Sequence, residues 1–238
     1  MSAARVVAIV CAGGRGERLG MPGGKQLANA GGKPVLAWVI AALDATPEID
    51  RIVLVCPGEL VEEFRIMAVD PVAPTTPVTY AQSGASRQAS VASGIAAAPE
   101  EAEILIVHDG ARPLVTPEII TSSILALEAN PLAAGVVVGQ RAIDSLKIAD
   151  GDVIVQTPDR SKYWAVQTPQ TFRAKAMRAA FAAADADGFI GTDDAAVVEH
   201  AGGTVLLVEG PRDNIKVTIA EDIALVEAIL AFRAAKEA

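Results

Sequence analysis

Short apolar runs alternate with alanine-rich stretches along most of this chain, and this alternation constrains the fold more than any other feature. The apolar runs are rich in β-branched residues, which favours strands, and they cover residues 5–11, 51–56, 78–81, 103–108, 133–139, 204–210 and 214–218. The alanine-rich stretches have helical spacing, and they cover residues 33–46, 59–69, 86–98, 117–129, 173–186, 193–201 and 220–236. Continuously apolar strands separated by helices predict an α/β fold with a Rossmann-like, mostly parallel sheet in three layers, covered by helices on both faces.

One segment, residues 140–168, interrupts the alternation. Two alternating runs there flank Asp150-Gly151, a dipeptide that favours a tight hairpin turn. A long hairpin that projects from an α/β domain often serves as a dimer arm. We therefore expect one domain spanning residues 1–238, with 140–168 as a projecting dimerisation arm of a homodimer.

The composition excludes several classes of partner. A net charge of -9 makes the chain a poor candidate for binding nucleic acid or an anionic membrane surface. Its two cysteines, Cys11 and Cys56, are too few for a disulfide framework and are predicted to be small buried hydrophobes in a reducing compartment. The N-terminus lacks a complete signal-peptide core, and no apolar run reaches membrane-spanning length. We expect a cytoplasmic protein.

Residues 12–26, AGGRGERLGMPGGKQ, form a glycine-rich turn between a predicted strand and a predicted helix. Such turns bind phosphate through unobstructed backbone N–H groups and the dipole of the helix. Two known patterns fail here: the dinucleotide fingerprint and the Walker motif both need a glycine where Leu19 stands, and the Walker motif also needs Ser or Thr at Gln26. What remains is a glycine turn with Arg15, Arg18 and Lys25, which fits a triphosphate. The alternative is a tight turn with solvated basic residues.

The glycine turn is one of seven sequence blocks, in order, that resemble the 2-C-methyl-D-erythritol 4-phosphate cytidylyltransferase family of the non-mevalonate isoprenoid pathway. The resemblance covers nearly the whole chain. Where the family commonly has Pro-Lys-Gln this chain has Gly24-Lys25-Gln26, and Ser145 stands where threonine is usual. The other six blocks are SGASRQASV (83–91), HDGARPLV (108–115), DSLK (144–147), TPDRSKYWAVQTPQTF (157–172), TDDAAVVE (192–199) and DNIKVT (213–218).

The resemblance implies transfer of CMP from CTP to a polyol phosphate, with release of pyrophosphate. The acceptor phosphate attacks the α-phosphorus in line, and because it is already ionised, no general base is needed. Arg18 and Lys25 are the candidates for offsetting negative charge in the transition state. The CTP-binding candidates are Ala12, Gly13, Gly14, Gly16, Gly84, Ser90 and Asp109.

Asp109 directly follows a predicted parallel strand, at the sheet edge where α/β proteins place ligands. An acidic residue there, in a site for triphosphates, suggests Mg²⁺, and Asp213 is a weaker second candidate ligand. An aspartate that caps the next turn is the alternative for Asp109. Arg112 is predicted either to contact substrate or to pair with Asp109.

Arg160 and Lys216 would be ordinary surface residues on spacing alone. The resemblance instead assigns both, together with Ser145, to the phosphate end of the acceptor, with Arg160 reaching the active site of the partner subunit. His108 is predicted to be a packed neighbour of the site, and Asp193 and Asp194 to cap a helix N-terminus.

Two other functions stay open on the residues. A cytidylyltransferase for another polyol phosphate, such as ribitol 5-phosphate, would share the glycine turn and the metal site. A nucleotide-sensing module without catalytic activity predicts the loss of Arg18, Lys25 or Asp109, and all three are present.

Overall fold

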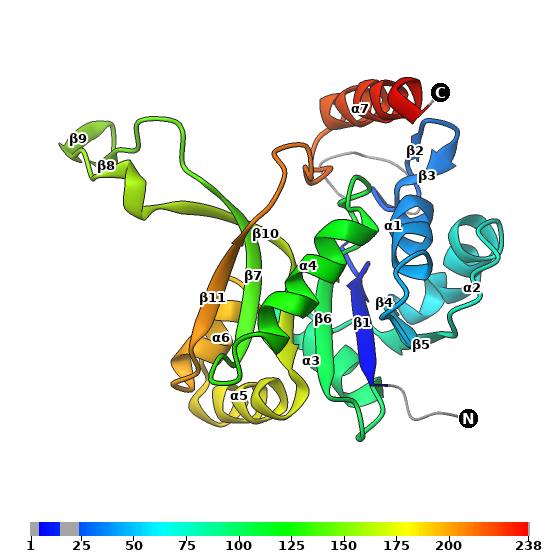
Figure 1. The fold of residues 1–238 in the computed structure, drawn as a ribbon, viewed down its shortest axis with the longest axis horizontal. Helices are drawn as coiled ribbons and strands as arrows, with labels where there is room; N and C mark the ends of the chain where they lie inside the picture. Colours follow the sequence, from blue (N-terminus) through cyan, green and yellow to red (C-terminus); the bar gives the residue numbers. More distant parts are fainter. Residues whose placement is uncertain (1–4, 15–23, 238) are drawn as a thin grey trace.

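The computed structural model describes residues 5–14 and 24–237, and a seven-stranded sheet runs through its centre. The strand order is β11-β7-β10-β6-β1-β4-β5, and every strand of this sheet except β10 runs in the same direction (Figure 1). These strands are β1 (Val6–Cys11), β4 (Arg51–Cys56), β5 (Val78–Gln82), β6 (Ile104–Asp109), β7 (Gly135–Arg141), β10 (Trp164–Arg173) and β11 (Val205–Glu209). The predicted three-layer α/β fold is confirmed.

Helices cover both faces of this sheet because its strands alternate between two hydrophobic clusters. In β1, Val6, Ala8 and Val10 pack into one cluster, whereas Val7 and Ile9 pack into the other. The first cluster includes residues of α1 (Val35–Asp44), α2 (Val61–Phe64) and α4 (Pro117–Glu128). The second includes residues of α3 (Arg87–Ala97), α5 (Ala174–Asp187) and α6 (Asp194–His200).

The β10 strand is the main departure from the predicted sheet. It lies between β6 and β7 and is antiparallel to both. Its register against β7 shifts between Val166 and Gln170, and Pro169 lies within this irregular stretch. The sequence analysis did not predict this strand because it contains polar residues and a proline, and prolines are rare in central strands.

The predicted strand at 214–218 is wrong. This segment has no regular secondary structure and instead crosses the carboxyl end of the sheet before α7 (Glu221–Glu237). One backbone hydrogen bond, from Val217 N–H to the Ala111 carbonyl, ties it there at 2.8 Å. The buried Asn214 side chain adds a second tie by donating to the Thr168 carbonyl at 2.8 Å.

The predicted arm does project from the sheet, but it covers fewer residues than 140–168. The short strands β8 (Ile148–Asp150) and β9 (Val153–Gln156) pair around Gly151, whose φ of 56° suits a tight turn. Figure 1 shows this hairpin extending far from the sheet. The outer residues of 140–168 belong to the sheet itself, because β7 reaches Arg141 and β10 begins at Trp164.

The described residues also form the β2–β3 hairpin (Asn29–Ala30 and Lys33–Pro34) and the short helices η1 (Gly58–Leu60), η2 (Arg65–Val69) and η3 (Arg160–Lys162). The β2–β3 hairpin packs under α7, as the shared hydrophobic cluster of Ala30, Val35, Val217 and Val226 shows. Within the described ranges, no helix is long and apolar enough to cross a membrane.

Candidate active site

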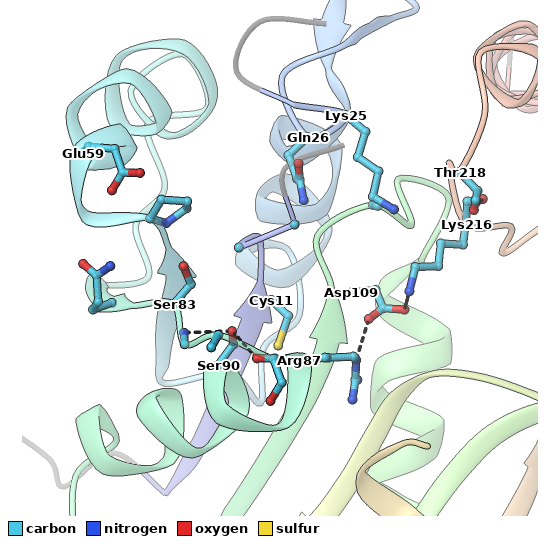
Figure 2. Close-up of a pocket in the computed structure, with 18 residues that line it drawn as sticks. Cys11, Lys25, Gln26, Glu59, Ser83, Arg87, Ser90, Asp109, Lys216 and Thr218 are labelled. Atoms are coloured by element: carbon cyan, nitrogen blue, oxygen red, sulfur yellow. Dashed lines mark hydrogen bonds and ion pairs between the residues drawn. The ribbon is translucent and has the colours of Figure 1, made fainter. Parts of the chain in front are cut away.

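A pocket of about 750 Å³ opens at the carboxyl ends of β1, β4 and β6. Its volume is typical of a site for a small organic ligand. The pocket extends from Glu59 and Ser83 at one end to Lys216 and Thr218 at the other (Figure 2). Ligands of open α/β sheets bind at this strand end.

One end of the pocket is lined by small residues. A Cβ atom on Gly13 would lie 2.5 Å from Ser83 Cβ, and a Cβ on Gly84 would lie 2.5 Å from Ala89 Cβ. Both glycines are therefore needed for close packing. The Gly84 N–H donates to Ser90 Oγ at 3.1 Å, and that hydroxyl donates to the Ser86 carbonyl at 2.9 Å. Gly13, Gly14, Gly84 and Ser90 thus line the pocket together, as the resemblance implies.

Asp109 ends β6 on the floor of the pocket, and three cationic side chains surround its carboxylate. Oδ2 lies 2.9 Å from Lys216 Nζ and 3.4 Å from Arg112 Nε, and Oδ1 lies 3.4 Å from Arg87 Nε. Figure 2 shows Lys216 and Arg87 on opposite sides of this carboxylate. Burial alone would raise the pKa of Asp109, but Lys216 and Arg87 outweigh burial and hold the pKa below its usual range.

Lys216 lines the pocket, although it lies on no strand or helix. The crossing segment 214–218 carries it over the pocket to Asp109. Arg112 is an ion-pair partner of Asp109 and also donates from Nη1 to the Asn214 carbonyl at 2.9 Å. Of the two roles left open for Arg112, the structure shows the pairing with Asp109.

Arg87 is a site residue that the sequence analysis missed. It is the first residue of α3, directly after Ser86, whose side chain caps the helix. Its Nη1 and Nη2 atoms donate to the two carboxylate oxygens of Asp194 at 3.0 and 2.8 Å. An arginine at a helix start beside small polar residues is the only local signal for this role.

Asp193 and Asp194, which were both predicted to cap a helix N-terminus, have different partners in the structure. Asp193 does cap α6, because its side chain accepts from the Ala196 N–H at 2.9 Å. Asp194 is buried and turns to Arg87 instead, so its reading as a capping residue is wrong.

Lys25 and Gln26 line the same pocket above the floor (Figure 2). The Gln26 side chain is almost fully buried, and its Oε1 atom has no hydrogen-bond partner among the described residues. The Gln26 carbonyl accepts from the Leu36 N–H at 2.9 Å, which fixes this part of the loop to the start of α1. Gln26 is a second residue that the sequence analysis did not assign.

The described residues among the remaining candidates do not line the pocket. Gly16 and Arg18 fall outside the described residues. Ala12 is buried directly before Gly13 and donates its N–H to the Val55 carbonyl at 2.8 Å. Asp213 pairs with Arg233 at 2.8 Å and does not line the pocket. Ser145 and Arg160 are exposed on the arm and do not line the pocket of their own chain.

His108 and the cysteines are structural neighbours of the site. Burial lowers the pKa of His108 to about 4, which keeps the ring neutral, and Nδ1 lies 3.1 Å from Thr168 Oγ1. This arrangement agrees with the predicted packing role. Cys11 and Cys56 are free thiols; Cys56 is buried, and the half-buried Cys11 borders the pocket.

A carboxylate among cations and an end lined by small polar residues can bind a nucleotide, and comparison with known proteins shows the family to which the chain belongs. The family model of 2-C-methyl-D-erythritol 4-phosphate cytidylyltransferase matches residues 6–232. The chain belongs to this family. As a cytidylyltransferase it is a nucleotidyltransferase, and the resemblance read from the seven sequence blocks is confirmed.

Individual members of the cytidylyltransferase family are similar to this chain over at least 94% of its length. The 2-C-methyl-D-erythritol 4-phosphate cytidylyltransferase of Caldanaerobacter subterraneus is 39% identical over 226 residues, 94% of this chain and 98% of that protein. The same enzyme of Nostoc punctiforme is 38% identical over the same shares. Among solved structures, the 4-diphosphocytidyl-2C-methyl-D-erythritol synthase of Anaerococcus prevotii superposes with a TM-score of 0.83 at 27% identity, covering 96% of each chain. The cytidylyltransferase of Thermus thermophilus gives a TM-score of 0.74 at 27% identity, covering 94% of this chain and 98% of that one.

Proposed function

We propose that this chain transfers CMP from CTP to 2-C-methyl-D-erythritol 4-phosphate, giving 4-diphosphocytidyl-2-C-methyl-D-erythritol and pyrophosphate, in the cytoplasm. An oxygen of the acceptor phosphate attacks the α-phosphorus of CTP. The bond from that phosphorus to the bridging oxygen of the β-phosphate breaks, and pyrophosphate leaves. Family membership over residues 6–232 supports the reaction. The observation that carries the site assignment is the Asp109 carboxylate held by Lys216 beneath the glycine turn.

The two ends of the pocket divide the work on CTP. The end at Gly13, Gly84 and Ser90 is assigned to the cytosine and ribose, on the resemblance and because its lining residues are small. Lys25 faces the triphosphate and offsets its charge as the α-phosphorus is attacked. Arg18 is proposed to share this task on the grounds of its place in the glycine turn.

The residues at Asp109 fit a Mg²⁺ ion that binds with the nucleotide. In the described part of the chain, His, Cys, Asp and Glu form no cluster of three or more that could hold a metal alone. Mg²⁺ is often bound by one or two carboxylates together with substrate phosphates, and Asp109 lines the pocket. Asp213 does not line the pocket, which favours Asp109 as the ligand. When bound, the ion would neutralise charge on the phosphate oxygens.

We propose that two chains form a homodimer through the arm. Val153, Ile154 and Val155 on its outer strand are 58–69% exposed. A two-stranded hairpin is marginally stable in water by itself, and exposed apolar side chains favour a partner. Arg160 and Ser145 lie on this arm. In the proposed dimer, both residues lie at the acceptor subsite of the partner, where Arg160 binds the acceptor phosphate alongside Lys216.

The test is pyrophosphate release measured with CTP, UTP, ATP and GTP, each against 2-C-methyl-D-erythritol 4-phosphate and ribitol 5-phosphate. Turnover is expected with CTP and the erythritol phosphate. Faster turnover with ribitol 5-phosphate would assign the chain a different acceptor, and equal kcat/KM for CTP and ATP would refute the base pocket.

A further inference from the structure

Asp194 is a buried carboxylate beside the active site, and the proposed reaction gives it no role. It lies at the start of α6 and is 1% exposed. Capping of α6 does not require it, because Asp193 provides the cap. A buried carboxylate is costly unless it is paired, so its partner matters.

The partner is Arg87, and the geometry uses both terminal nitrogens of the guanidinium. Nη1 and Nη2 donate to Asp194 at 3.0 and 2.8 Å. Only Nε remains for Asp109, at 3.4 Å. A planar guanidinium that binds one carboxylate through two parallel hydrogen bonds has its orientation fixed. Asp194 therefore decides how much of Arg87 reaches Asp109.

The two oxygens of Asp109 are consequently unequal. Oδ2 has a close contact with Lys216 at 2.9 Å and a second with Arg112 at 3.4 Å. Oδ1 has the long contact with Arg87 Nε at 3.4 Å. Oδ1 is thus the less engaged oxygen, and it is the atom best able to exchange its contact for a cation.

The charges around Asp109 also favour a role for Asp194 in cation binding. Three cationic side chains surround Asp109, and without Asp194 they would form a strongly positive cluster that repels a divalent ion. The Asp194 carboxylate balances the charge of Arg87 within a mostly buried pair. Repulsion at Asp109 is reduced without any contact between Asp194 and the ligand.

We propose that Asp194 is a positioning residue that holds the Arg87 guanidinium away from Asp109 and so keeps Oδ1 available to a divalent cation bound with CTP. The proposal rests on the proposed function, in which Asp109 meets Mg²⁺ bound with CTP. If Asp194 loses its charge, Arg87 is released to bind Asp109 through two nitrogens and to compete with the cation. If Arg87 is also removed, no competitor remains.

The experiment measures the dissociation constant of CTP by calorimetry, without acceptor, in Mg²⁺ and in EDTA. The ratio of the two constants gives the gain in CTP affinity that Mg²⁺ provides. In Asp194→Asn this gain is expected to fall about tenfold, the size typical for outer-shell partners of metal ligands. In the double variant Arg87→Gln/Asp194→Asn it is expected to return to within about threefold of the wild-type value, on the same scale. Asp193→Asn, on the same helix end but without contact to Arg87, is the matched control and should match the wild type.

Each outcome decides something. If the wild type gains no CTP affinity from Mg²⁺, the proposed metal role of Asp109 fails, and the role of Asp194 fails with it. If the wild type gains affinity but Asp194→Asn gains as much, only the role of Asp194 is refuted. Should Asp194→Asn not fold, the double variant decides, since it removes both buried charges: a gain well below the wild-type value refutes competition by Arg87.

Discussion

Gly13 and Ser83 pack so closely that a Cβ atom on Gly13 would lie 2.5 Å from the Cβ of Ser83. The neighbouring Gly14 is different, because among the described residues the nearest atom to a Cβ there would be Gln26 Nε2 at 3.6 Å, an ordinary contact distance. At Gly13 packing against Ser83 requires a glycine, whereas at Gly14 the described residues leave room for a methyl group.

Gly13→Ala is expected to lower the free energy of unfolding by about 1–3 kcal/mol, the usual cost of forcing an extra methyl group into packed structure. Gly14→Ala is the matched control and should change it by less than about 0.5 kcal/mol. Urea denaturation of both variants and the wild type measures the difference. Equal stability of the two variants would contradict the packing at Ser83.

Lys25→Ala is expected to lower kcat by about 100-fold or more, since it removes one preorganised charge from a site that stabilises a charged transition state. The pyrophosphate-release assay with CTP measures this loss. Lys175→Ala, on the exposed face of α5, is the control for removing a lysine and should retain wild-type kcat. Circular dichroism and thermal unfolding of Lys25→Ala should resemble the wild type. Near-normal turnover would remove Lys25 from the catalytic assignment.

Asp44→Asn is expected to destabilise the protein at neutral pH and to cost progressively less in acid. The Asp44 carboxylate accepts from Thr76 N–H at 2.8 Å and from Thr75 Oγ1 at 3.2 Å. Burial opposes the charged form, but these hydrogen bonds outweigh burial and lower the pKa below its ordinary 3.8. A lowered pKa in the folded state means that the stabilisation is complete above the ordinary value and is lost as the pH falls through the folded value. Urea midpoints of wild type and variant at pH 7, 5 and 3 should therefore converge at the lowest pH; a constant gap would refute this.

Arg160→Ala is expected to raise KM for the acceptor while leaving CTP binding nearly unchanged, because Arg160 lies on the arm and not in the pocket of its own chain. The decisive measurement mixes Arg160→Ala subunits with Lys25→Ala subunits. If Arg160 acts across the dimer, a mixed dimer has one site lacking both residues and one complete site, so activity returns.

If Arg160 instead acts within its own chain, every site in the mixed dimer lacks one residue and mixing restores nothing. Subunit exchange can be verified by mass spectrometry of differently labelled chains. Exchange without recovered activity would rule out a shared site.

The sequence by itself determined the elements whose signal is local. Continuous β-branched runs predicted β1, β4 and β6 to within about a residue at each end, because a strand buried on both faces must be apolar throughout. Asp109 was placed at the strand end for the same reason. The glycine turn pointed to Lys25, which does line the pocket, since a glycine-rich turn beside positive charge can be recognised in the sequence without knowing its neighbours.

Only the tertiary structure decided which distant segments meet. The sequence of β10 contains polar residues and a proline, and its place in the sheet depends on pairing with β6 and β7. The segment 214–218 looks like a strand but pairs with no strand of the sheet, and it carries Lys216 over the pocket instead. The Arg87–Asp194 pair joins the starts of α3 and α6. Periodicity and propensity describe a residue's own element, whereas burial and charge pairing depend on contacts between elements far apart in the chain.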